Sequence, residues 1–238
     1  MAVTPAPTEA KSESVRRMFS RIARRYDLMN ALMTAGRHHA WRRMAAATVA
    51  AAPPGPVLDL ATGTGDLALA VRRVRPTATV VGADFSEAML REAAVKLRRS
   101  DARVPLLAAD ALRLPFRDAT FAAVTSAFLL RNLTDLDAGI AEMRRVTRAG
   151  GLVVTLEITR PRIPGWDGVF GFYFHRVVPA IGALVAGDRA AYAYLPDSVD
   201  RFVSPQGLAD LMRRRGLADV HYRRLGIGTI ALHVGLVS

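Results

Sequence analysis

Two glycines that directly follow a short apolar run are the feature that most constrains the fold of this chain. Residues 57–61 read VLDLA, the pattern of a buried strand, and Gly63 and Gly65 follow before a helical pattern begins at Asp66. Glycine allows positive φ angles and a close approach of a ligand to the backbone, and the first turn of a helix carries free N–H groups. A strand, a glycine loop and a helix in this order predict a ligand site at the carboxyl end of the strand.

The rest of the chain repeats this alternation of strand and helix. Helical patterns begin at Asp66, Glu87, Leu136 and Pro205, and Gly150 is predicted to end the third of them. The further strand-like runs are residues 79–83, 104–110, 121–129, 152–158, 218–225 and 228–237. Because strands that alternate with helices form βαβ units, we expect an α/β fold with a Rossmann-like, doubly wound and mainly parallel sheet.

Three segments stand outside the alternation. Residues 15–52 carry a basic helical pattern, and residues 160–200 carry a cluster of aromatic residues that predicts a helical, aromatic-rich insertion before the last strands. Residues 1–14 are rich in Pro, Ser, Thr and Ala and lack the apolar region of a secretory signal, so we expect a disordered tail. Residues 15–238 are then expected to form a single domain in which the insertion caps the substrate.

The charge of the chain suggests an anionic partner, and its residue types limit the chemistry. Lys and Arg number 33 against 21 Asp and Glu, which gives a net charge of +12 and favours nucleic acid or an anionic membrane surface. With no Cys, the chain has no disulfide, no Cys-ligated metal and no cysteine nucleophile. We expect no metal site. The longest apolar stretch, residues 177–187, is shorter than the roughly 20 residues that span a bilayer.

Acidic residues around the glycine loop indicate what it binds. Asp84 ends the second strand, where a carboxylate accepts hydrogen bonds from both hydroxyls of a ribose. Asp59 and Asp66 flank the loop, and their charges repel a pyrophosphate but suit a cation. Residues 63–68 also match the G-x-G-x-x-A dinucleotide pattern, which keeps NAD open as an alternative. S-adenosylmethionine, with a sulfonium and an ammonium beside its ribose, suits this acidic loop better.

Several short motifs occur together along the chain. They are Tyr26-Asp27-Leu28-Met29-Asn30, Trp41-Arg42-Arg43, Gly63-Thr64-Gly65-Asp66, Asp84-Phe85-Ser86-Glu87-Ala88-Met89-Leu90, Leu130-Arg131-Asn132, Arg148-Ala149-Gly150-Gly151 and Ala231-Leu232-His233. With them the chain resembles the class I S-adenosylmethionine-dependent methyltransferases and, more narrowly, the family that C-methylates menaquinone and ubiquinone precursors. The resemblance covers about residues 14–238, and the first motif and the aromatic insertion identify the narrower family.

The resemblance implies S-adenosylmethionine as cofactor and a set of residues that bind it. The loop around Thr64 lines the cofactor, Asp84 takes the ribose, and Asp110 lies against the adenine. The expected cofactor-binding residues are Asp59, Gly63, Thr64, Gly65, Asp84, Phe85, Asp110, Ala111 and Ala127. The chain departs from the family at Ala127, where Ser is common, and at Leu129, where the family has Gly; both changes bear on the shape of the pocket.

The resemblance also implies methylation of a ring carbon in a lipophilic polyprenyl quinol. The carbon becomes nucleophilic when the neighbouring phenolic hydroxyl loses its proton, so the site must align the reactants, exclude water and stabilise the phenolate. Arg131 by charge and Asn132 by hydrogen bond are the expected groups for this oxygen. Tyr26, Asp27 and His175 are further candidates, and each also suits packing or ion pairing.

Other functions remain open at this stage. Demethylmenaquinol is the expected substrate, and a ubiquinone-precursor benzoquinol is the alternative because the motifs are shared. An RNA methyltransferase of the same fold is disfavoured, since no Asn/Asp-Pro-Pro motif follows the fourth strand and a C5 mechanism needs Cys. A non-catalytic cofactor-binding module is suggested by Ala127 and Leu129.

The helical arginines and the aromatic residues of segment 163–195 suit an anionic bilayer that holds a lipid quinol. We therefore expect a cytoplasmic protein in peripheral contact with the inner face of the plasma membrane, and no nucleic-acid partner. The oligomeric state is left open.

Overall fold

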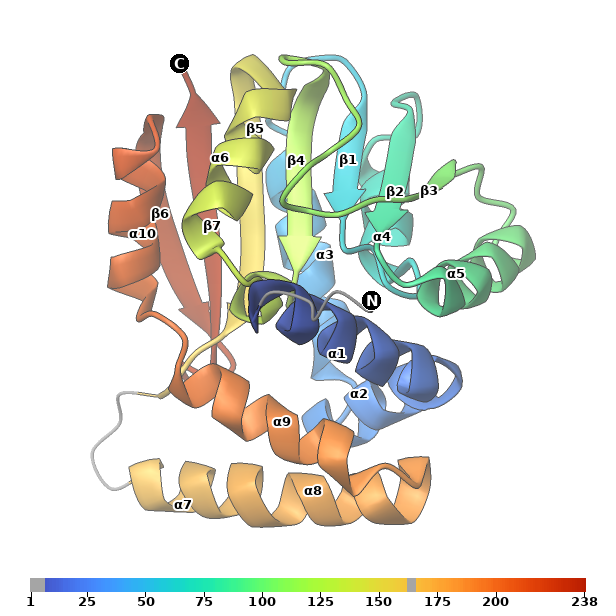
Figure 1. The fold of residues 1–238 in the computed structure, drawn as a ribbon. Coiled ribbons are helices and arrows are strands. Elements are labelled where there is room, and N and C mark those ends of the chain that lie inside the picture. The colour runs from blue at the N-terminus through green and yellow to red at the C-terminus, as the bar shows by residue number, and fades with distance from the viewer. Residues whose placement is uncertain (1–6, 162–165) are drawn as a thin grey trace, which may run out of the picture.

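A seven-stranded sheet forms the centre of the computed structural model, which describes residues 7–161 and 166–238 (Figure 1). The strands are β1 Val57–Leu60, β2 Val80–Asp84, β3 Leu106–Ala108, β4 Phe121–Ala127, β5 Thr147–Ile158, β6 Leu217–Leu225 and β7 Ile230–Val237. Their order is β3-β2-β1-β4-β5-β7-β6. Neighbours from β3 to β5 are parallel, and β7 runs antiparallel to β5 and β6. The predicted doubly wound, mainly parallel sheet is confirmed.

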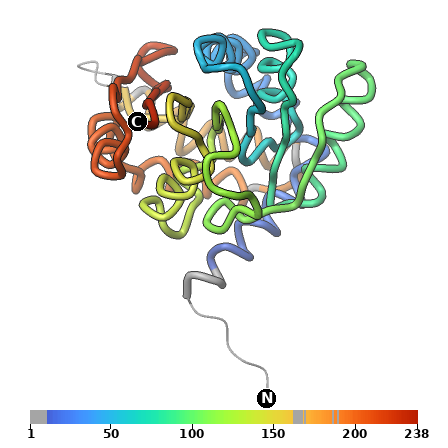
Figure 2. Tube along the Cα trace, turned by 90° about the horizontal axis from the view of Figure 1, so that it is seen from above, coloured from blue at the N-terminus to red at the C-terminus, as the bar shows by residue number. Residues whose placement is uncertain are grey.

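Helices cover both faces of the sheet (Figures 1 and 2). On one face lie α3 (Arg37–Val49) and α4 (Asp66–Val74), with α5 (Glu87–Arg99) packed beside α4. On the other lie α6 (Leu136–Val146) and α10 (Pro205–Arg214). Apolar residues at helical spacing, such as those of α6, meet the sheet and are fully buried. Both faces therefore contribute to the core, and the ends of the strands remain free to build a site.

Capping residues fix most of the helix boundaries that the sequence predicts. The Ser86 hydroxyl accepts a hydrogen bond from the Met89 N–H at the start of α5, and the Asp135 carboxylate caps α6. Gly150 was expected to end α6, and this prediction is wrong. The helix ends at Val146 because the next residue already pairs with β4, and Gly150 lies inside β5 with a φ of +74°.

The N-terminal segment is helical from Pro7 onward. It forms α1 (Pro7–Ile22), the single turn η1 (Ala23–Arg25) and α2 (Tyr26–Thr34). The expectation of a disordered tail over residues 1–14 is therefore wrong for residues 7–14, while residues 1–6 lie outside the described part. The polar residues at the start of α1 do not indicate a helix. The helix is held by its following turns, where Val15, Met18 and Ile22 are buried.

The predicted helical insertion is confirmed. Its segments are α7 (Trp166–Phe172), η3 (Tyr173–Val177), α8 (Val178–Ile181), η4 (Gly182–Ala186) and α9 (Arg189–Asp200). Figure 1 shows α7 and α8 in one long rod, with α9 between that rod and the sheet. The wider turns of η3 and η4 flank Pro179, whose missing N–H interrupts the α-helical pattern. The insertion and α1 both lie at the carboxyl ends of the parallel strands.

Candidate active site

The loop after β1 is shaped by the carboxylate at the end of β2. Gly63 N–H donates to Asp84 Oδ2 at 2.9 Å, and Ser86 N–H donates to Oδ1 at 2.8 Å. Gly63 has a φ of +55°, and a Cβ added there would meet open space, so the backbone itself faces the adjoining cleft. Burial raises the pKa of Asp84 to about 6, although its backbone hydrogen bonds oppose the rise. The carboxylate is thus held in one orientation beside the loop.

A first cavity opens at this edge of the sheet, between the strand ends and α1. Of the predicted cofactor residues, the ones in its wall are Gly63, Asp84, Phe85, Asp110, Ala111 and Ala127. Ser12, Val15 and Phe19 of α1 cover it. Among the described residues of this wall there is no Lys or Arg. This lining therefore fits S-adenosylmethionine, whose sulfonium, ammonium and carboxylate give a net positive charge beside a ribose, and does not fit a pyrophosphate.

Three predicted cofactor residues lie behind the loop and are not in this wall. Asp59 is 1% exposed and accepts hydrogen bonds from the hydroxyls of Thr62 at 2.6 Å and Thr125 at 3.1 Å. Burial raises the pKa of Asp59 to about 6 despite these bonds. The Thr64 hydroxyl is turned to another carboxylate, and Gly65 turns the backbone with a φ of +87°. Their positions favour support of the loop over contact with a ligand.

A lysine connects this loop to the N-terminal helices. Lys96 Nζ on α5 lies 2.6 Å from Asp66 Oδ1, 2.5 Å from Asp27 Oδ2 and 3.0 Å from the Thr64 hydroxyl. Thr64 also donates to Asp27 Oδ1 at 2.6 Å. Asp27, a candidate for the oxygen side of the reaction, therefore serves an ion-pair network. This network holds α2 against the glycine loop.

A second, larger cavity of about 540 Å³ lies between the N-terminal helices and the insertion. Its wall is mostly apolar and includes Met18, Ile22, Trp41, Phe170, Phe174 and Leu195. Four residues line both cavities: Phe19, Tyr26, Phe128 and Asn132. Two of the predicted catalytic residues, Tyr26 and Asn132, are thus located where a ligand of one cavity would meet a ligand of the other.

Arg131 forms a buried ion pair in the wall of the second cavity. Its Nη1 lies 3.0 Å from Glu157 Oε2 and 2.8 Å from the Phe128 carbonyl oxygen, and its side chain is 6% exposed. The other Glu157 oxygen accepts the Leu130 N–H at 2.6 Å. Burial raises the pKa of Glu157, and the Arg131 charge opposes the rise. Sequence reasoning gave Glu157 no role, although it orients Arg131 beside the shared wall.

The two departures from the family pattern have different consequences. Ala127 lines the first cavity, where it offers no side-chain hydroxyl. Leu129 has a φ of −88°, which any residue adopts, so the glycine of the family is not needed for the backbone here. The unusual backbone belongs to Phe128, whose φ is +66°. Leu129 instead adds an apolar side chain to the wall of the first cavity.

His175 lies apart from the other predicted catalytic residues. Its side chain is 44% exposed, its Nε2 lies 3.2 Å from Asp200 Oδ2, and it is in the wall of neither cavity. Its position favours a surface contact with Asp200 over a catalytic role. The aromatic residues around it gave no indication of which side of the helix faces the cavity.

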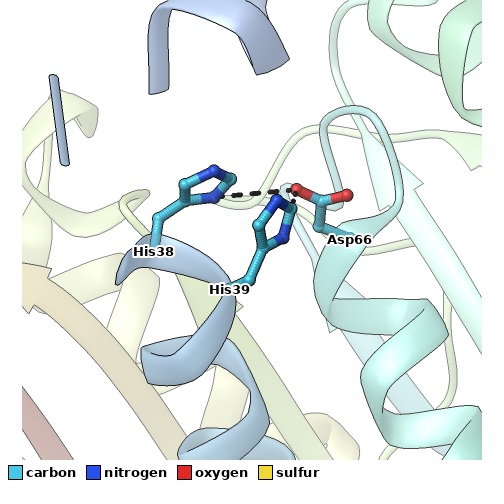
Figure 3. A group of neighbouring side chains, drawn as sticks. All are labelled: His38, His39 and Asp66. Atoms are coloured by element: carbon cyan, nitrogen blue, oxygen red, sulfur yellow. Dashed lines mark ion pairs between the residues drawn. The ribbon is translucent and has the colours of Figure 1, made fainter. Parts of the chain in front are cut away.

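His38, His39 and Asp66 form a cluster whose spacing would suit a metal ion (Figure 3). The Nδ1 atoms of the two histidines lie 3.9 and 4.0 Å from Asp66 Oδ2. Two cations already bind this cluster, since Arg42 Nη1 lies 2.6 Å from His38 Nδ1 and Lys96 Nζ lies 2.6 Å from Asp66 Oδ1. A divalent ion would have to displace or withstand both charges, so the donor set argues against a metal centre.

The fold and the carboxylate-held glycine loop are those of a class I S-adenosylmethionine-dependent methyltransferase, and the described residues of the adjoining cleft include no basic side chain. The solved structure of a SAM-dependent methyltransferase from Aquifex aeolicus has this fold: its TM-score is 0.59 at 15% identity, and the match covers 89% of this chain and 98% of that one. A model of the ubiE/COQ5 methyltransferase family matches residues 7–237. The chain belongs to the ubiE/COQ5 methyltransferase family.

Curated relatives match over almost the whole chain. A demethylmenaquinone methyltransferase from Roseiflexus sp. (strain RS-1) is 46% identical over 233 residues, which are 97% of this chain and 96% of that protein. A ubiquinone/menaquinone biosynthesis C-methyltransferase UbiE from Desulfotalea psychrophila (strain LSv54 / DSM 12343) is 45% identical over 227 residues, 95% of this chain and 92% of the relative. The predicted family and enzyme class are confirmed.

Proposed function

We propose that the protein transfers the methyl group of S-adenosylmethionine to a ring carbon of demethylmenaquinol. The observation that carries this proposal is the wall shared by the two cavities. A cleft suited to the methyl donor meets a large apolar cavity at Phe19, Tyr26, Phe128 and Asn132. The names of the relatives, most of them demethylmenaquinone methyltransferases, support the naphthoquinol over the benzoquinol.

In this proposal the first cavity holds the donor. Asp84 accepts hydrogen bonds from the ribose, the backbone of Gly63 lies against the donor, and Asp110 and Ala111 meet the adenine. When bound, S-adenosylmethionine supplies an electrophilic methyl group and leaves as a neutral thioether. The chain must then supply alignment, a dry site and stabilisation of the quinol oxygen.

Arg131 serves that oxygen, and Asn132 serves the other hydroxyl of the quinol. The hydroxyl proton leaves to solvent, the ring carbon bonds to the methyl carbon as the S–C bond breaks, and the electron pair of that bond stays on sulfur. The ring-carbon hydrogen then leaves as the hydroxyl is protonated again, so each transfer releases one proton. Arg131 stays protonated throughout and acts by charge. Asn132 donates through Nδ2 to the Phe128 carbonyl at 3.0 Å, which leaves Oδ1 as an acceptor for a hydroxyl.

The test is turnover with the donor and each demethylated quinol, read by product mass. We expect the naphthoquinol to gain one methyl group, and the benzoquinol to react more slowly. Titration with NADH and incubation with RNA test the rival functions. Methylated RNA, NADH binding in place of donor binding, or donor binding without any methylated quinol would overturn the proposal.

We also propose that the mouth of the second cavity meets an anionic membrane. Leu32 and Ile227, which line this cavity, are 48% and 57% exposed, and Leu184 on the insertion is 87% exposed. Arg37 is in the same cavity wall, and Arg25 donates to the Val185 carbonyl beside Leu184. Exposed apolar side chains among arginines suit anionic lipid. In the described part of the chain, no helix is both long and apolar enough to cross a bilayer.

Liposome flotation tests this surface. We expect the protein to float with vesicles that contain phosphatidylglycerol, and Leu184→Glu to weaken flotation. The matched control is Val95→Glu on α5, which changes an apolar residue that is 37% exposed on another helix. Wild-type protein that stays wholly in the soluble fraction, or equal losses in both variants, would contradict a specific membrane face.

A further inference from the structure

His38 lies in the wall of the second cavity and has no role in the mechanism above. It is in the first turn of α3, and only 1% of its side chain is exposed. Its Nε2 atom is buried and has no hydrogen-bond partner among the described residues. Buried polar atoms are nearly always paired, so an unpaired one at a cavity wall points to a ligand.

Arg42 fixes which ring nitrogen of His38 carries the proton. Arg42 Nη1 lies 2.6 Å from His38 Nδ1, one helical turn away, and a guanidinium can only donate. Nδ1 therefore accepts, and in a neutral ring the proton is on Nε2. Arg42 is itself held in place, since it is 6% exposed and lies over the Phe128 ring at 5.1 Å. His38, a residue of the cavity wall, thus carries a buried N–H donor that no described residue accepts.

The surroundings of His38 also keep the ring neutral. Burial is the main cause that lowers the pKa of His38 to about 4. Arg42 and His39 on α3 lower it further, while Asp66 on α4 and Asp27 on α2 oppose them and raise it. Figure 3 shows both histidine rings beside Asp66. At neutral pH the ring is therefore uncharged.

Other residues of the same cavity wall also carry buried polar atoms without a partner. Within the described residues they are Asn30 Nδ2, Arg131 Nε, Asn132 Oδ1 and the Tyr192 hydroxyl. Together with His38, these residues give a mostly apolar cavity wall several donors and an acceptor. A flat apolar ring with two oxygens, one anionic and one a hydroxyl, matches such a set.

We propose that His38 is a further catalytic residue, whose Nε2–H donates a hydrogen bond to the quinol oxygen that is negative when the ring carbon attacks the methyl group. This inference rests on the proposed function and adds a residue to the same site. The S–C bond breaks and the C–C bond forms as above, with the hydroxyl proton already in solvent, and His38 keeps its own proton throughout. A neutral imidazole stabilises the oxygen without protonating it.

The kinetic test uses three variants. His38→Leu removes the donor, His38→Gln places an amide N–H near the position of Nε2, and His39→Gln changes the exposed neighbour on the same turn. We expect kcat to fall on the order of 10²-fold in His38→Leu, as on loss of one oxyanion donor, with partial recovery in His38→Gln. The affinity for S-adenosylmethionine, measured by calorimetry, is expected to stay unchanged in all three.

A probe that does not depend on turnover separates this inference from the proposed function. 4-Nitro-1-naphthol changes its absorbance on ionisation, and a donor at its oxygen lowers its apparent pKa when bound. We expect His38→Leu to raise this apparent pKa by about one unit, a tenfold change in the ionisation constant, and His39→Gln to leave it unchanged. If the wild type methylates no quinol and the probe pKa still responds to His38→Leu, the proposed function fails, while the assignment of His38 as a hydrogen-bond donor to a bound oxygen stands.

Nitrogen-15 spectra of labelled histidine test the charge state directly. From pH 6 to pH 9 we expect His38 to remain the neutral Nε2–H tautomer. We also expect the pH dependence of kcat to have the same shape in the wild type and in His38→Gln. Unchanged kcat and probe pKa in a folded His38→Leu, or an Nδ1–H tautomer, would overturn the inference while quinol methylation stands. If His38→Leu fails to bind S-adenosylmethionine, His38→Gln and the nitrogen-15 spectra of the wild type decide the test.

Discussion

Lys96 offers the sharpest test of how the N-terminal helices are held on the cofactor loop. It is one of only two lysines in a chain with 33 basic residues. Its compact ammonium lies within 3.0 Å of three acceptors, on Asp27, Thr64 and Asp66. Lys96→Met keeps the length and the apolar stem and removes the charge, the hydrogen bonds to Thr64 and Asp66 and the ion pair with Asp27.

The expected loss of stability depends on how exposed the partners of Lys96 are. The Asp66 side chain is 11% exposed, and a hydrogen bond to such a charged group contributes about 1.5–3 kcal/mol. Asp27 is 42% exposed, so its ion pair adds little. We therefore expect the free energy of unfolding to fall by about 2–3 kcal/mol, and Tm by about 5–10 °C for a chain of this length. Urea unfolding followed by circular dichroism measures this loss, with Lys11→Met as the matched control.

The pH dependence gives a second readout. Burial raises the pKa of Asp66, but the charges of Lys96 and Arg42 more than offset this and hold the pKa below its usual value. An Asp with a lowered pKa stabilises the fold above its unfolded pKa and loses this contribution as pH falls through the folded value. The difference between wild type and Lys96→Met is therefore expected to shrink below about pH 4. A loss under about 0.5 kcal/mol at pH 7, or a difference that grows in acid, would refute the reasoning.

Three further predictions test the cavities. Asp84→Asn is expected to weaken binding of S-adenosylmethionine at least about tenfold in calorimetry at pH 7.5. The affinity of the wild type is expected to fall below about pH 6, because the raised pKa of Asp84 lets its carboxyl protonate there. Equal affinities of the two proteins would contradict a ribose contact. Glu157→Gln leaves the Arg131 charge without its buried partner, so we expect urea unfolding to show a loss of about 3 kcal/mol, and a loss under about 1 kcal/mol would count against the pair. Gly182→Ala places a Cβ 2.4 Å from the ring of Tyr192, so a lower Tm and a higher KM for the quinol are expected; an unchanged KM would show that Tyr192 does not shape the cavity.

The fold was largely predictable because its signals are local. Helices α4 and α5 occupy the residues that the sequence patterns indicated, since a glycine loop precedes one and Ser86 caps the other. The start of α1 at Pro7 and the end of α6 at Val146 were missed. Both depend on contacts with distant parts of the chain, which propensity and spacing do not report.

The candidate site was predictable where it follows the strand ends. Asp84 and Asp110 line the first cavity because the carboxyl ends of parallel strands meet at one edge. His38 and Lys96 were assigned no role, because their significance arises where separate helices meet. A histidine one turn before an arginine was a local signal for His38, but only burial at a cavity wall shows that one ring nitrogen lacks a partner.

Carbon methylation of the quinol is the central claim, and the position of the transferred methyl group tests it most directly. Enzyme, S-adenosylmethionine labelled with carbon-13 in its methyl group and demethylmenaquinol are incubated under reducing conditions, and the product is examined by NMR. The account predicts a labelled methyl group on the ring carbon next to a hydroxyl-bearing carbon. A labelled methyl group on oxygen, or unreacted quinol beside tightly bound donor, would contradict it.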